Sequence, residues 1–150
     1  MCISQVSLTA PLWRDFSGTY VAGNGFTLDP DKQQTVTLEH AAGYGWGDTF
    51  TYLDTTFFRG DERTYSLFGE TAARWSLTDS DQDRSNQAVT DVLIAASLEF
   101  GSGTVETFTL GPSVDLNVAG FDYLHLGLMR RESVNRSGFN NSDGWQFVPT

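Results

Sequence analysis

The segment from Tyr65 to Leu77 alternates between two kinds of side chain at every second residue. One set is apolar or small, with aromatic residues near both ends, and the other set carries Glu70 and Arg74. A period of two is that of a β-strand, whose successive side chains lie on opposite faces. A strand with one apolar and one ionic face is typical of a transmembrane β-barrel, which has lipid outside and water inside. A soluble barrel more often encloses its apolar face.

The same alternation recurs along the whole chain and predicts about eight strands joined as a meander. Gly43 to Gly47 is predicted to be a tight turn, and residues 79–91 are predicted to be a polar surface loop with a short helix at its end. We expect residues 1–12 to be flexible and residues 13–150 to form a single β-barrel domain that is incomplete at its C-terminus. The predicted strands cover residues 16–23, 34–44, 48–58, 65–77, 92–100, 105–118 and 121–131, with a last one beginning at 144.

Composition supports an all-β chain and excludes some functions. The 150 residues include 15 glycines and are 13% aromatic, which favours strands and turns over helices. Nineteen acidic residues against nine basic ones give a net charge of -10, which argues against a nucleic-acid polymer as partner. No run approaches the roughly 18 apolar residues of a membrane helix, and no signal peptide is visible in the chain.

Catalytic motifs are not found. His40 and His125 lack metal-ligand spacing, and there is neither a Gly-x-Ser-x-Gly elbow nor a Walker-type phosphate loop. Asp48 and Asp54 would lie roughly 20 Å apart on one strand face, which is too far for a glycosidase pair. We therefore predict a protein that is not an enzyme and has no cofactor or metal.

Aromatic and charged side chains share one face of two neighbouring predicted strands. Phe50 and Tyr52 lie on the same face as Asp48 and Asp54, and Phe68 lies on the same face as Glu70 and Arg74. Such a surface suits a small solute with a flat π-face and several hydroxyl or amide groups, because bases stack on aromatic rings and carboxylates accept hydrogen bonds. The alternative is that Phe50 and Phe68 pack a soluble core, with Glu70 paired to Arg74 at the surface.

Several segments resemble the Tsx-like nucleoside-specific channels of the Gram-negative outer membrane. They are Thr35-Val-Thr-Leu-Glu-His-Ala-Ala-Gly-Tyr-Gly-Trp-Gly-Asp-Thr-Phe-Thr-Tyr-Leu-Asp54, Phe68-Gly-Glu-Thr-Ala-Ala-Arg-Trp-Ser-Leu77, Val118-Ala-Gly-Phe-Asp-Tyr-Leu124 and Asp143-Gly-Trp-Gln-Phe-Val-Pro149. The second is similar to the family's Gly-Glu-x-x-Pro-Arg-x-Ser-Leu pattern. Ala73 and Ala119 stand where the family has proline, and several family strands are unaccounted for.

The resemblance implies a monomeric barrel of about twelve strands in the outer membrane, through which nucleosides diffuse passively without a cofactor. The partners would be nucleosides and outer-membrane lipid. The candidate lumen residues supply polarity, stacking surfaces or hydrogen-bond acceptors, and they are Phe68, Glu70, Arg74, Phe50, Tyr52, Asp54 and Glu39.

Two other functions stay open. One is a soluble β-barrel binding protein of the calycin type, which would hold its apolar face inward around a hydrophobic ligand. The other is a catalytic barrel with Glu70 or Asp54 as acid/base.

Overall fold

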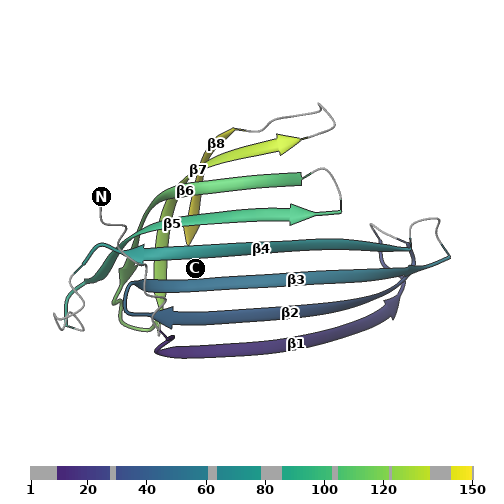
Figure 1. Cartoon of the computed structure of the whole chain (residues 1–150), viewed down its shortest axis with the longest axis horizontal. Coiled ribbons are helices and arrows are strands. Elements are labelled where there is room, and N and C mark those ends of the chain that lie inside the picture. The colour runs from purple at the N-terminus through teal and green to yellow at the C-terminus, as the bar shows by residue number, and fades with distance from the viewer. Residues whose placement is uncertain are drawn as a thin grey trace, which may run out of the picture.

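The chain forms one antiparallel sheet of eight strands (Figure 1). The computed structural model describes residues 10–27, 30–60, 64–78, 86–102, 105–121, 123–135 and 143–149. Each strand pairs with the next along the chain, and the described ranges contain no helix. The strands are β1 (Trp13–Asn24), β2 (Lys32–Tyr44), β3 (Gly47–Arg59), β4 (Tyr65–Ser76), β5 (Val89–Gly101), β6 (Val105–Leu116), β7 (Leu124–Asn135) and β8 (Gly144–Pro149). The predicted all-β, up-and-down arrangement is confirmed.

Some predicted boundaries were wrong by a few residues. β1 begins at Trp13 instead of Phe16, because Trp13 still pairs with Gly43 of β2. β7 begins at Leu124 instead of residue 121 and runs to Asn135 instead of residue 131. Residues 1–9 of the predicted flexible segment and residues 79–85 of the predicted loop lie outside the described residues. The helix predicted at the end of that loop is wrong, because residues 86–88 are not helical and β5 already begins at Val89.

The sheet is open. Within the described residues β1 pairs only with β2 and β8 pairs only with β7, so closure into a barrel stays a prediction. β1 to β4 lie side by side along most of their length, whereas β5 to β8 curl away from them (Figure 1).

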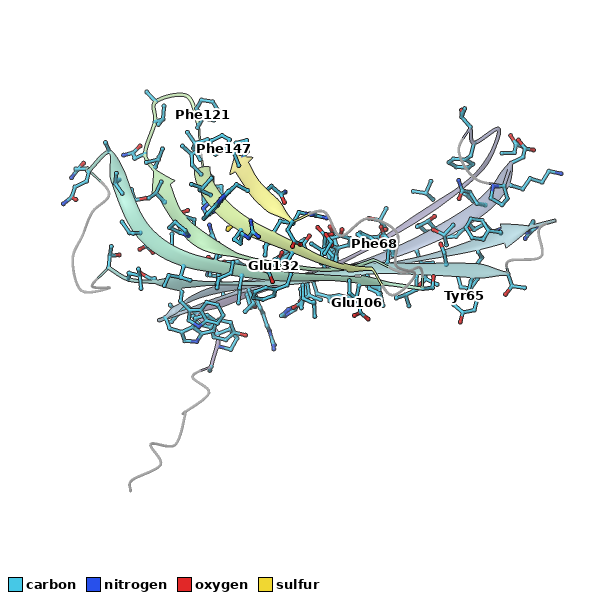
Figure 2. The ribbon with its side chains drawn as sticks, turned by 90° about the horizontal axis from the view of Figure 1, so that it is seen from above. Tyr65, Phe68, Glu106, Phe121, Glu132 and Phe147 are labelled. Atoms are coloured by element: carbon cyan, nitrogen blue, oxygen red, sulfur yellow. The ribbon has the colours of Figure 1, made fainter. Side chains whose placement is uncertain are left out.

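The strand register aligns side chains of the same kind, so that each face of the sheet has one character across neighbouring strands. Glu39, Tyr52, Glu70 and Glu99 are direct neighbours across β2 to β5. One residue further along, the opposite face carries Leu38, Leu53, Gly69 and Phe100 in the next row. Figure 2 shows the curved sheet with Tyr65 and Phe68 on opposite sides, and the ionic face is the concave one.

The concave face buries some apolar side chains, among them Leu93 and Met129, but polar side chains are buried beside them. The concave face buries the polar residues Thr107, Thr109, Ser113 and His125, and Thr107 is among the largest fully buried side chains. The convex face leaves large apolar side chains exposed, and nothing in the described residues covers it. Its exposed members include Phe16, Tyr20, Leu38, Phe57, Tyr65, Trp75, Ile94, Leu98, Phe108, Leu110, Leu128, Trp145 and Phe147. An exposed apolar surface of this extent is unusual for a soluble monomer.

The β2–β3 turn depends on a glycine. Gly47 has a φ of 141°, and a Cβ atom built on it would lie 1.9 Å from the carbonyl oxygen of Arg74. The turn itself consists of Gly45 and Trp46, which is shorter than predicted because the strands continue to Tyr44 and resume at Gly47. A Cβ atom on Gly45 would meet nothing within 4 Å.

Gly47→Ala is therefore expected to lower the free energy of unfolding by about 1–3 kcal/mol, because the new Cβ strains the backbone and separates β3 from β4. Denaturant titration of the refolded protein measures this change. Gly45→Ala is the matched control and should change stability by less than about 0.5 kcal/mol. Equal effects of the two substitutions would contradict the assignment of strain to Gly47.

Candidate ligand site on the concave face

The concave face contains a hollow of about 390 Å³, a volume within the range of small-molecule sites. Side chains from β3 to β8 and from the segment before β7 line it, which requires the curl of the sheet. Its polar and aromatic lining includes Asp48, Phe50, Glu70, Arg74, Ser97, Glu99, Thr109, Tyr123, His125 and Gln146.

Arg74 is the most connected side chain of the site. Its Nε and Nη2 atoms donate to the two carboxylate oxygens of Asp48 on β3, at 2.8 and 2.5 Å. Its Nη1 atom donates to Asp115 on β6 at 3.0 Å and also to the hydroxyl of Tyr123. The bidentate pair fixes the plane of the guanidinium, since two parallel hydrogen bonds hold it. Arg74 therefore ties β4 both to its neighbour β3 and to β6, two strands away.

His125 completes this cluster and is itself buried. Its Nδ1 atom lies 2.8 Å from Asp115 Oδ1 and 2.8 Å from Arg74 Nη1. Arginine can only donate, so Nδ1 accepts from Arg74 when it carries no proton and donates to Asp115 when it does. Burial raises the pKa of the neighbouring Tyr123 phenol, and the charge of Arg74 partly offsets that rise.

A second charged cluster lies closer to the other end of the strands. Arg131 on β7 donates through Nη1 and Nη2 to the two carboxylate oxygens of Glu99 on β5, at 3.2 and 3.1 Å. The same guanidinium donates to Gln146 of β8 and Thr107 of β6. Three of the charged groups that line the hollow, those of Asp48, Arg74 and Glu99, are thus held in place by partners on other strands.

Three aromatic rings follow one another on the concave side of β3 and β4. The centroids of Phe50 and Tyr52 are 6.0 Å apart, and those of Tyr52 and Phe68 are also 6.0 Å apart. Phe50 and Phe68 are each 40% exposed, so their faces remain available to a solute. We call Phe50, Tyr52 and Phe68 the aromatic track.

The structure places all seven predicted lumen residues on the concave face, but they do not form one cluster. Phe50, Glu70 and Arg74 line the hollow, and Tyr52 and Phe68 continue from it along the aromatic track. Asp54 and Glu39 lie further away, and each already accepts a hydrogen bond from a neighbouring strand: Asp54 from Thr37 at 2.6 Å and Glu39 from Ser17 at 2.8 Å.

The surface pair of Glu70 with Arg74, which the alternative of a soluble core includes, is not formed. Arg74 bonds to Asp48 and Asp115, while Glu70 forms neither a hydrogen bond nor a salt bridge with any described residue. Glu70 lies directly across from Glu99, and Glu99 is neutralised by Arg131. Glu70 is therefore the carboxylate of the hollow that is free to accept hydrogen bonds from a solute.

Sequence reasoning did not select several residues of the site. Asp48 shares the predicted face of Phe50 and Tyr52 but is not among the predicted lumen residues, and neither are Glu99, Asp115, Tyr123, His125 and Arg131. All six belong to the polar set of the alternation. The alternation assigns each side chain to a face of the sheet. Whether a side chain reaches a partner two strands away depends on the curvature of the sheet.

The described residues contain no group of three or more side chains that could together bind a metal ion. They also contain no helix long and apolar enough to cross a membrane. No family model matches the chain, and searches of curated proteins and of solved structures found no match either. The resemblance to nucleoside channels therefore stays a prediction, and the function has to be inferred from the geometry of the two faces.

Arg74→Met is expected to lower the free energy of unfolding by about 2–3 kcal/mol, because it leaves Asp48 and Asp115 without their cation in a largely desolvated cluster. Denaturant titration measures the loss. Arg130→Met is the matched control, since Arg130 lies on the convex face, 44% exposed and 3.9 Å from Glu132. Its loss should be at most about 1 kcal/mol. Losses of similar size would show that the Arg74 cluster stabilises the fold no more than an exposed ion pair does.

Proposed function

We propose that this chain forms the wall of an outer-membrane channel through which nucleosides or similar small polar solutes diffuse passively. The observation that carries the proposal is the curvature of a two-faced sheet, which turns the ionic face inward and the apolar face outward. A membrane barrel needs this arrangement, because lipid surrounds it and water fills it.

The length of the convex apolar surface fits a bilayer. Tyr65 and Trp75 mark its two ends on β4 and are ten positions apart, which corresponds to about 34 Å along a strand. A strand tilt of about 40° shortens this to about 26 Å along the membrane normal, close to the apolar band of about 25 Å in outer-membrane barrels.

Aromatic residues gather at both ends of this surface, as in the girdles of membrane barrels. At one end Trp46 stacks on Tyr44 with centroids 5.0 Å apart and on Trp75 at 5.9 Å. At the other end Phe57 is the direct cross-strand partner of Tyr65. Leu98 and Leu110 lie between the ends on β5 and β6, and the exposed pair Arg130 and Glu132 lies at the same level on β7.

The alternative of a soluble calycin-type protein needs the reverse curvature, with apolar side chains inside. Here the concave hollow is lined by the charged groups of Asp48, Glu70, Arg74 and Glu99, from which a hydrophobic ligand would have to displace water. We therefore favour the channel.

A complete channel requires that the β1 and β8 edges be paired, because lipid cannot satisfy exposed backbone groups. We propose a closed, monomeric barrel of about twelve strands, to which these eight contribute. Permeation through it is passive and uses no cofactor.

The lining of the hollow fits nucleosides better than phosphorylated solutes. The aromatic track offers faces on which a base can stack, and the free Glu70 carboxylate can accept hydrogen bonds from ribose hydroxyls. Asp48, Glu70 and Glu99 outnumber Arg74 among the charged groups of the lining, which disfavours an anion.

Leu98→Arg tests the membrane orientation. Leu98 lies on the convex side of β5, opposite Thr71 of β4 and about midway between Tyr65 and Trp75, so an arginine there should cost about 2–4 kcal/mol of insertion free energy. Insertion into phosphatidylcholine vesicles, measured by resistance to protease, should fall accordingly. Ser97→Arg introduces the same charge on the concave face and should insert like the parent protein. Full solubility of the native parent protein without detergent would defeat the channel proposal.

Replacement of Phe50 and Phe68 by alanine tests the solute. Each ring is expected to contribute about 1–3 kcal/mol to base stacking, so the double variant should weaken nucleoside-dependent block of ion conductance by at least about fivefold. Phe108→Ala removes a ring from the convex face instead and should leave the block unchanged. Unchanged block in the double variant would remove the aromatic track from the mechanism.

A further inference from the structure

We propose that Lys32 and Arg59 form a binding site for the phosphate of an anionic lipid headgroup at one rim of the sheet. The proposal rests on the membrane orientation argued above and adds a specific lipid contact to it.

The two cations face each other and have no acidic partner among the described residues. Lys32 on β2 and Arg59 on β3 are direct cross-strand partners and therefore lie on the same face. Neither forms a hydrogen bond or an ion pair with any residue that the structure describes. Like charges directly opposite each other destabilise a sheet. The chain has only nine basic residues against nineteen acidic ones, so an unpaired juxtaposition of two cations calls for an anion.

A hollow with amide side chains lies beside the two cations. A shallow hollow of about 250 Å³ lies at this rim, and its lining includes both cations together with Asn24 and Gln34 of the same face. Asn24 is the cross-strand partner of Lys32 on the other side, so the three side chains form one row across β1 to β3. Arginine binds phosphate through its planar fork, lysine as a point charge, and the amides can donate further hydrogen bonds.

The position of the row favours a lipid phosphate over a free one. Two residues further inward on the same convex face, the next row contains Ala22, Gln34, Phe57 and Tyr65. Phe57 and Tyr65 belong to the aromatic end of the apolar surface, and the cations lie about 7 Å beyond them along the strands. Headgroup phosphates lie at this level when aromatic rings occupy the membrane interface.

The test compares flotation of the refolded full chain with vesicles of phosphatidylcholine and with vesicles of an equimolar phosphatidylcholine–phosphatidylglycerol mixture. The parent protein should prefer the mixed vesicles. Each cation near an anionic surface contributes enough to change binding about fivefold. Arg59→Gln should therefore reduce the preference about fivefold, and the double variant Lys32→Gln/Arg59→Gln should reduce it about 25-fold.

Arg14→Gln is the matched control, because Arg14 is an exposed cation on the same convex face at the opposite end of β1. It should leave the preference unchanged. A loss equal to that of Arg59→Gln would show diffuse attraction of the whole protein and overturn the site.

Three further outcomes would also overturn the proposal and separate it from the channel proposal. Equal binding of all variants to both kinds of vesicle would remove the lipid site and leave the membrane orientation intact. Binding to neither kind would remove the channel proposal and the lipid site with it. Calorimetric binding of inorganic phosphate to the detergent-solubilised parent protein, lost in Arg59→Gln, would identify free phosphate as the ligand instead of a lipid.

Discussion

The reach of Arg74 across the sheet is the interaction on which the site depends. Its guanidinium holds Asp48 on the adjacent strand and Asp115 two strands away, and a flat sheet would keep the second carboxylate out of range. His125 and Tyr123 join the same cluster from the far side. Because these groups are charged and largely withdrawn from water, the loss of the cation would leave two carboxylates facing each other. The cluster therefore stabilises the curl of β4 to β7.

Curvature then decides what each face of the sheet can contact. The side toward which the sheet bends gathers carboxylates, guanidinium groups and hydroxyls into a hollow, with the aromatic track leading along its wall. The opposite side spreads its leucine, phenylalanine and tryptophan side chains over a broad outer surface. Water on one side and lipid on the other satisfy both faces at once. In the proposed channel, solutes contact the inner face, and lipid tails and headgroups contact the outer face.

Much of the fold was predictable because the signal for it is local. The period-two pattern placed Glu70 and Arg74 on one face and Trp75 on the other without reference to any neighbour, and the register of β3 with β4 confirms that assignment. Phe50, Glu70 and Arg74 could be selected as candidates for the same reason. Glu99, Asp115, His125 and Arg131 carry the same facing signal, but nothing in it says that Arg74 would bond to Asp115 instead of Glu70. That choice depends on distances between strands far apart in the chain.

The amino-acid sequence alone thus determined the strands, their order and the chemical character of the two faces, since alternation along a pleated strand fixes side-chain direction residue by residue. The tertiary structure decided which face became the inner one. It also decided that Arg74 would join β3 to β6, that Glu70 would remain free, and that Lys32 and Arg59 would meet at the rim. Strand register and sheet curvature set these outcomes, because both are properties of several strands together and no single strand encodes them.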